Sequence, residues 1–220
     1  MKTTILILLF GFGFAPAMSQ VLDLLTFRGA DFSDVAKTSV DFGVVVGDGD
    51  LIGARVNWKA GENVLVMGDL GLAEAFDDEI ALGGGAMFKI NTGMKVDTAL
   101  KATIHTLLDS DADVIDASVL GIASKDIEGV KGLEWYGNVG LHYVDVDVSV
   151  TTSVPNFSSI FGIETEDITV SSSDNDVVLT FGGGINYEFN QKYEGFAGLD
   201  ILVGDLYDDV VFGLGGRVNF

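Results

Sequence analysis

The last eleven residues, Val210-Val211-Phe212-Gly213-Leu214-Gly215-Gly216-Arg217-Val218-Asn219-Phe220, alternate along the chain. Every even position is apolar or glycine, whereas Arg217 and Asn219 occupy odd positions, and the final residue is aromatic. A period of two over about ten residues is what a tilted β-strand needs to cross a bilayer. The pattern therefore predicts a membrane-spanning strand at this end of the chain.

This ending resembles the terminal strand of bacterial outer-membrane β-barrels, in which a final Phe and alternating apolar residues form the assembly signal. The matching residues here are Phe212, Leu214, Val218 and Phe220. The segment 185–193, INYEFNQKY, also resembles the short-turn hairpins of OmpA- and OmpW-type barrels. The resemblance implies a location in the outer membrane of a Gram-negative bacterium and insertion by the barrel assembly machinery. It further implies contact with lipid and lipopolysaccharide, and roles from structural anchoring to narrow porin activity.

The beginning of the chain has the pattern of an export signal. A basic start, Met1-Lys2, precedes an apolar run over 5–14 and the small residues Ala15-Pro16-Ala17. These features predict a signal peptide over 1–17, and cleavage after Ser19 is the alternative. Residues 18–37 follow without a period of two, and they could plug the lumen or lie at the periplasmic face. We expect the barrel domain to span 38–220.

Composition favours the same class of protein. The chain has no Cys, which excludes a lipoprotein anchor and disulfides. A mean hydropathy of +0.38 combined with a net charge of −21 suits apolar residues that face lipid and charges that lie in lumen and loops. Glycines inside expected strands, as at 83–85 and 182–184, would weaken a soluble sheet, but they let the strands of a tight barrel coil.

Read backward from Phe220, the alternation predicts an all-β fold, a transmembrane antiparallel up-and-down β-barrel. Ten strands are expected, over 38–47, 51–60, 64–75, 79–90, 94–106, 114–124, 133–148, 177–189, 193–203 and 210–220. The strand at 114–124 alternates least, and losing it would require losing a second strand, which leaves eight. Strand 133–148 changes phase near Tyr143. Either a β-bulge lies there, or the strand rises above the membrane and continues as a loop hairpin.

The inward positions carry a balanced set of charges. They are Arg55, Lys59, Lys89, Lys95, Lys101, Arg217, Asp41, Asp69, Asp97, Glu188, Glu194 and Asp200. Buried charges persist when they are paired, so one interpretation is an ion-paired and nearly closed lumen. The other is a thin polar passage for small solutes or ions. Six outward aromatics near the periplasmic end predict an interfacial girdle, namely Trp58, Phe88, Trp135, Phe189, Tyr193 and Phe220.

Acidic residues concentrate in the loops expected on the outer side. Asp109, Asp111 and Asp113 imitate the first half of a calcium loop, although Val114 and Leu120 replace its glycine and glutamate. Two hypotheses follow: Ca²⁺ binding there, or bridging of lipopolysaccharide phosphates through divalent ions. The alternative is a solvated acidic surface. The negative charge disfavours nucleic acid as a partner.

Enzymatic motifs are absent from the sequence. It has no phosphate-binding loop, zinc spacing or nucleophile elbow. The two histidines, His105 and His142, are predicted to face inward, and His105 with Asp109 or Ser110 is the one arrangement that suggests a rim hydrolase. We therefore expect a non-enzymatic barrel without a cofactor, either structural or a narrow channel. An outer-surface binding module that uses the carboxylate-rich loops is the alternative.

Overall fold

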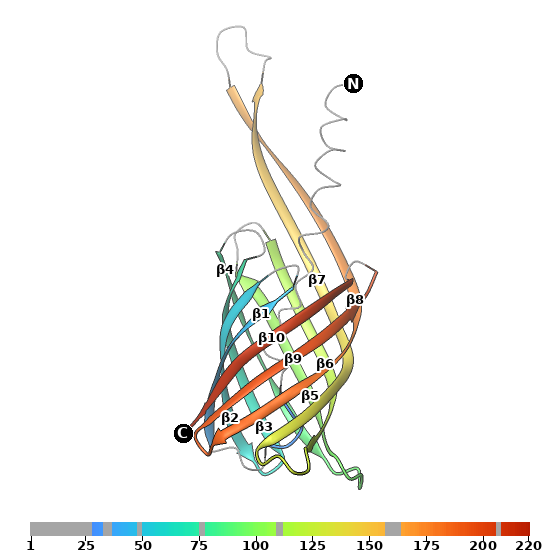
Figure 1. Ribbon diagram of the computed structural model, residues 1–220. Coiled ribbons are helices and arrows are strands. Elements are labelled where there is room, and N and C mark those ends of the chain that lie inside the picture. Colours follow the sequence, from blue (N-terminus) through green and yellow to red (C-terminus); the bar gives the residue numbers. More distant parts are fainter. Residues whose placement is uncertain are drawn as a thin grey trace.

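The computed structural model describes residues 28–32, 37–47, 50–74, 78–108, 112–156, 164–205 and 208–220, and they form a closed antiparallel barrel (Figure 1). Its ten strands are β1 Thr38–Val46, β2 Leu51–Gly61, β3 Val64–Glu74, β4 Asp78–Ile90, β5 Asp97–Leu108, β6 Ala112–Asp126, β7 Leu133–Asn156, β8 Glu164–Asn190, β9 Tyr193–Val203 and β10 Asp208–Asn219. Each strand pairs with the next along the chain, and β1 pairs with β10 to close the sheet. The prediction of ten strands is confirmed. Among the described residues, no helix is long and apolar enough to cross a membrane. The expected signal peptide lies outside the described residues.

The weakly alternating segment 114–124 is a full member of the wall. Strand β6 pairs with β5 from Asp97↔Ser124 to Leu108↔Asp113, and with β7 from Ala112↔Val148 to Asp126↔Glu134. A strand that bonds to two neighbours over this length cannot be a loop. The eight-stranded alternative is therefore wrong.

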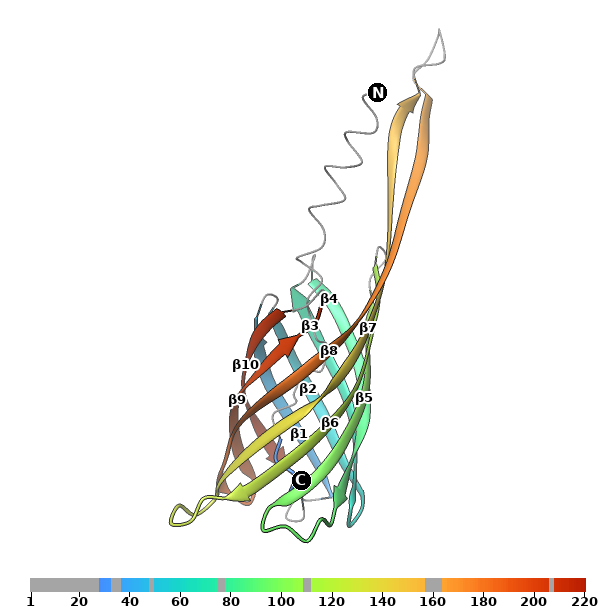
Figure 2. The ribbon, with the colours of Figure 1, turned by 90° about the vertical axis from the view of Figure 1, so that its right-hand side faces the viewer.

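Strands β7 and β8 extend well beyond the others and project from the barrel as a two-stranded arm (Figures 1 and 2). Their pairing runs without a register shift from Leu133↔Tyr187 to Asn156↔Glu164. The bulge expected near Tyr143 is therefore absent from this pairing, and the alternative of a hairpin that continues outward is correct. Most of the segment expected to link 148 to 177 is strand.

The phase change in β7 has an environmental cause. Even positions stay buried across it, from Asn138 and His142 to Val144 and Val146, while Asp147 is exposed. The strand keeps the same positions facing inward, but these inward residues change from polar to apolar, and the outward ones change from apolar to polar. Near this level the apolar outer surface ends and an apolar interior begins.

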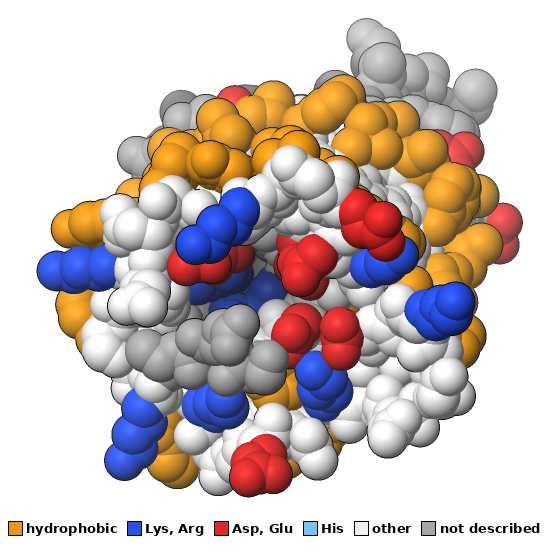
Figure 3. Space-filling view, turned by 60° about the horizontal axis from the view of Figure 1, so that its bottom comes forward, with side chains coloured by type: hydrophobic (Ala, Val, Ile, Leu, Met, Phe, Trp, Pro, Cys, Tyr) orange, Lys and Arg blue, Asp and Glu red, His pale blue; other side chains and the backbone are white. Residues whose placement is uncertain are grey.

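Large apolar side chains cover the outside of the barrel. Ile52, Ile104 and Leu214 are each about three-fifths exposed, and the six expected girdle aromatics are all exposed. The register places Trp58 opposite Thr38 and Tyr193 opposite Val218, at the end where the chain terminates. We call this the inner end and the opposite one the outer end. Figure 3, which views the inner end, shows charged side chains of both signs around the mouth and hydrophobic side chains along the upper part of the wall.

Glycines inside the strands make room for large inward side chains on the neighbouring strand. A Cβ at Gly83 would collide with the ring of His105, its register partner. The same relation joins Gly182 of β8 to Asp200 of β9, and Gly215 of β10 to Phe196 of β9, which are also register partners. The glycine clusters are thus sockets in the inner surface of the wall.

Candidate functional site: the barrel lumen

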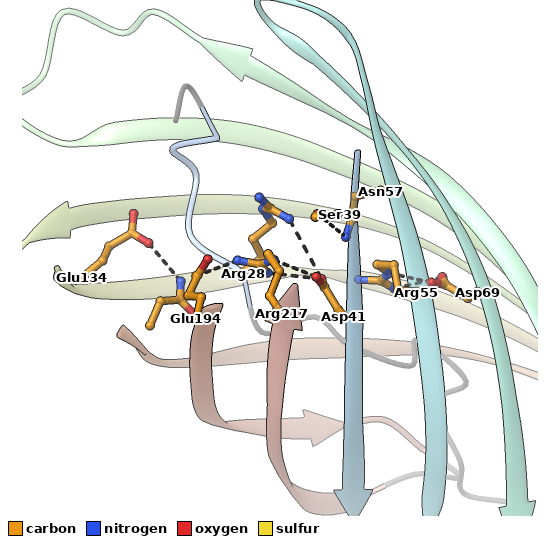
Figure 4. A network of polar contacts seen from close by, with 10 residues as sticks. Arg28, Ser39, Asp41, Arg55, Asn57, Asp69, Glu134, Glu194 and Arg217 are labelled. Atoms are coloured by element: carbon orange, nitrogen blue, oxygen red, sulfur yellow. Dashed lines mark hydrogen bonds and ion pairs between the residues drawn. The ribbon is translucent and has the colours of Figure 1, made fainter. Parts of the chain in front are cut away.

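Two arginines and two carboxylates meet in the inner half of the lumen (Figure 4). The Arg217 guanidinium donates to Asp41 from Nε at 2.6 Å and from Nη2 at 3.2 Å, and to Glu194 from Nη1 at 2.6 Å. Arg28, which precedes the barrel in sequence, brings its Nη1 to 3.9 Å from Asp41 Oδ2. Both guanidiniums and Asp41 are almost fully buried. Arg217 is thus shared between two carboxylates.

A second polar cluster lies farther toward the outer end. The Arg55 guanidinium binds both oxygens of Asp69, with Nη2 at 2.9 Å from Oδ2. His105 Nε2 lies 2.8 Å from the same carboxylate oxygen. His142 Nδ1 lies 3.1 Å from Asp116 Oδ1, and all of these side chains are buried. The histidines are therefore held by carboxylates inside the barrel wall.

Most of the sequence-derived lumen residues lie on the inner surface. Those buried are Arg55, Lys101, Arg217, Asp41, Asp69 and Asp200, and those half-buried include Lys59, Lys89 and Glu194. Lys89 Nζ lies 2.9 Å from Asp97 Oδ1 at the inner rim, where both side chains are partly exposed.

Two of those residues lie elsewhere, and both are exposed. Lys95 precedes β5, which begins at Asp97 rather than at 94. Glu188 lies opposite Glu194 near the end of β8, just before a register shift, and its side chain is exposed there. A bulge near a strand end is not visible as a break in hydrophobic periodicity.

Several lumen residues were not identified from the sequence. Asp116 lies on the weakly alternating strand β6, and its position between Val114 and Ser118, both also inward, was the available signal. Arg28 belongs to a segment without periodicity, so no pattern pointed to it. Of the proposed calcium ligands, Asp109 and Asp111 lie outside the described residues and Asp113 is exposed. No group of three or more potential ligands for a metal occurs in the part of the chain that the structure describes.

An apolar layer, which we name the outer seal, closes the outer end of the lumen. It receives at least one inward side chain from every strand of the barrel. Its members, in strand order, are Val45, Leu51, Ala73, Ala81, Leu107, Val114, Val144, Val146, Val178, Leu202 and Val211, and the same apolar cluster continues inward to Tyr136 and Phe196. All of them except the partly buried Val211 are at most 7% exposed. These side chains contact one another as one buried cluster, so they fill the cross-section of the lumen rather than only line its wall.

Residues 28–32, which we name the inner plug, lie inside the lumen near its inner end. The Ala30 amide donates to Ser124 Oγ at 2.8 Å, and Asp31 Oδ1 lies 2.9 Å from Lys89 Nζ. Phe32 is 1% exposed. Its apolar neighbours are on the inner surface of the wall, in a cluster that contains Ala30, Leu65, Met67, Met87, Ala99, Leu120 and Ile122.

No protein-family model matches the chain, and no curated protein matches it in sequence. Similar solved structures include the N-terminal β-barrel domain of Pseudomonas aeruginosa OprF, with 16% identity, a TM-score of 0.41, and coverage of 84% of this chain and 99% of that one. The KdgM porin has 8% identity, a TM-score of 0.42, and coverage of 83% and 99%. The Yersinia pestis outer membrane protein Ail has 15% identity, a TM-score of 0.36, and coverage of 84% and 99%.

Likenesses of this degree carry no conclusion about function. What the chain's own coordinates show is a closed ten-stranded sheet with an apolar outside and a polar, ion-paired interior. The expected fold is therefore confirmed: the protein is an all-β, antiparallel up-and-down barrel of ten strands.

Proposed function

We propose that the protein is a structural outer-membrane barrel whose lumen does not conduct solutes. The observation that carries this proposal is the outer seal, to which all ten strands contribute. An apolar constriction excludes water, and an ion or small polar solute cannot pass without its hydration shell. A ten-stranded barrel is also narrow enough for its side chains to fill much of its interior.

The outer surface supports the membrane location. Exposed apolar side chains on all ten strands would be unfavourable in water over so wide an area, whereas they suit hydrocarbon. The aromatic girdle at the inner end suits the interface between headgroups and water. We assign the inner end to the periplasm, because a girdle, both barrel ends of the chain and the short turns lie there.

Planar-bilayer recording of the refolded mature chain tests the closed lumen. We expect no steady pore current at moderate voltage. A triple variant, Leu51→Ser, Leu107→Ser and Val178→Ser, opens the outer seal and serves as the positive control, because it replaces apolar side chains on three separate strands. A steady current from the unmodified chain would overturn the proposal.

A second candidate is an outer-surface binding module. The exposed carboxylates at the base of the projecting arm favour it, because Asp147 and Asp174 lie at the outer end of the wall and both are exposed. Calorimetry with Ca²⁺ and the refolded protein is the test. A lack of heat at millimolar Ca²⁺ removes the divalent-ion form of this candidate.

The buried histidines disfavour a rim hydrolase. His105 and His142 are each 1% exposed, so neither ring is accessible to a substrate from outside. His105 contacts Asp69 rather than a residue of the 109–111 segment. We expect His105→Ala to lower the free energy of unfolding. We expect neither the unmodified protein nor this variant to cleave lipids or peptides.

A further inference from the structure

We propose that the inner plug is a releasable closure of the periplasmic mouth, separate from the outer seal, so that the lumen is a chamber with two independent closures. The outer closure is the one on which the proposed function rests. The inner closure is a binding site on the lumen wall, and its ligand is residues 28–32 of the same chain.

The plug adds a positive charge to the inner half of the lumen. Arg217 is shared by Asp41 and Glu194, and one guanidinium cannot neutralise two carboxylates. Arg28 of the plug supplies the second positive charge beside Asp41. Because an uncompensated charge is costly in a buried place, the attraction between Arg28 and Asp41 favours the seated plug.

The plug is attached without joining the sheet. Within the described residues, no backbone–backbone hydrogen bond links 28–32 to a strand. Its amides at Ala30 and Asp31 instead donate to the hydroxyl of Ser124, and Asp31 pairs with Lys89 at the partly exposed rim. Leaving the lumen therefore breaks side-chain contacts and leaves the barrel's ladder intact.

The apolar part of the site is preformed by the wall. Leu65, Met87 and Leu120 come from three different strands and surround Phe32 and Ala30. Such a pocket on the strands would be exposed to periplasmic water if the plug left. The hydrophobic effect thus favours the seated plug. Loss of the Phe32 ring would substantially weaken the binding of the plug to the wall.

Thiol accessibility tests the inner closure, because the chain has no cysteine of its own. A Ser39→Cys variant places one thiol on β1 at a position that is 0% exposed. A membrane-impermeant cationic thiol reagent is applied to the refolded protein in detergent micelles. We expect protection in this background, and at least tenfold faster labelling when Arg28→Glu and Phe32→Asp are added.

Two control variants define the baseline. Lys37→Glu, a charge reversal at an exposed position that follows the plug in sequence, leaves Ser39→Cys protected. Thr92→Cys, in an exposed turn, reacts in every background. Equal labelling of Ser39→Cys with and without the plug substitutions overturns the proposal.

An engineered disulfide tests whether the plug is seated even if the Arg28→Glu and Phe32→Asp variant fails to fold. The amide of Ala30 lies 2.8 Å from Ser124 Oγ, so Ala30→Cys with Ser124→Cys should cross-link on oxidation and lock the plug. Reduction should then return the labelling rate of Ser39→Cys to the rate measured without the disulfide. Failure to cross-link in the folded barrel contradicts a seated plug.

Conductance separates this inference from the proposed function. The Arg28→Glu and Phe32→Asp variant should stay silent in a planar bilayer, because the outer seal remains. A current from it would mean that the outer seal does not close the lumen, while the plug itself would still stand as the closure. If Ser39→Cys stays protected in that same variant, the proposal that residues 28–32 close the inner mouth is contradicted.

Discussion

The two halves of the lumen are closed by opposite chemistry. The outer half is closed by apolar side chains from all ten strands, and these need no partner from outside the wall. The inner half contains buried charges, and one of its cations, Arg28, comes from a segment outside the sheet. Apolar closure is therefore built into the barrel, whereas ionic closure depends on an additional piece of chain.

The charged half should show the largest response to a single substitution. Arg217→Met removes the arginine that Asp41 and Glu194 share and leaves the more distant Arg28, and removal of one partner from a buried ionic network costs about 3–5 kcal/mol. We expect a loss of that size in the free energy of unfolding, measured by urea titration in lipid vesicles. Lys95→Met, at an exposed position, is the matched control and should change little.

A loss of less than about 1 kcal/mol for Arg217→Met, a size typical of exposed ion pairs, would break the comparison. It would mean that the carboxylates are hydrated or become protonated at little cost. The inner half would then be a wet vestibule rather than a buried network.

The apolar half should respond through a cavity. Leu202→Ala removes a side chain that is 3% exposed in the outer seal, and such truncations cost about 2–5 kcal/mol in protein cores. The same vesicle titration measures it. Leu72→Ala, on the lipid-facing side and 55% exposed to the surroundings, is the control. Lipid chains can fill the space that it leaves, so we expect a smaller loss there.

Equal losses for Leu202→Ala and Leu72→Ala would show that the outer seal is no tighter than the lipid contact. Brief current bursts from Leu202→Ala, with none from Leu72→Ala, would instead distinguish the outer seal from the lipid-facing surface. They would identify the apolar layer as the barrier to ions.

The sequence predicted the wall better than what fills it. Hydrocarbon outside the barrel selects apolar residues at every second position, so the pattern reveals strands even where side chains make no contact with one another. It could not reveal the pair of Asp41 with Arg217, because those residues lie 176 positions apart and periodicity carries no information about partners.

The outer seal was missed for a related reason. Each strand supplies only one or two of its residues, so no single segment contains a recognisable apolar motif. In β7 the seal residues Val144 and Val146 instead looked like a shift in register. An inward apolar residue and an outward one give the same letter in the sequence, and only the closed sheet distinguishes them.

The glycine sockets should give an intermediate effect. Gly83→Ala places a methyl group against the ring of His105 and close to the backbone oxygen of Ile104, so part of the wall must shift. Overpacking of this kind costs about 1–3 kcal/mol. Gly68→Ala, whose added Cβ meets nothing within 4 Å, is the matched control and should be neutral. If both variants unfold alike in the vesicle titration, the glycines serve strand coiling rather than side-chain accommodation.

The rim of the inner mouth should give the smallest effect. Lys89 bridges Asp31 of the plug and Asp97 of β5, but the three side chains are 25%, 36% and 43% exposed, and solvent screens such pairs. We expect Lys89→Met to lower the free energy of unfolding by less than about 1 kcal/mol. The effect should shrink further in high salt, because screening shortens the range of the attraction. A loss comparable to that of Arg217→Met would relocate the main attachment of the plug from the buried arginines to the rim, and ionic strength alone would then open the inner mouth.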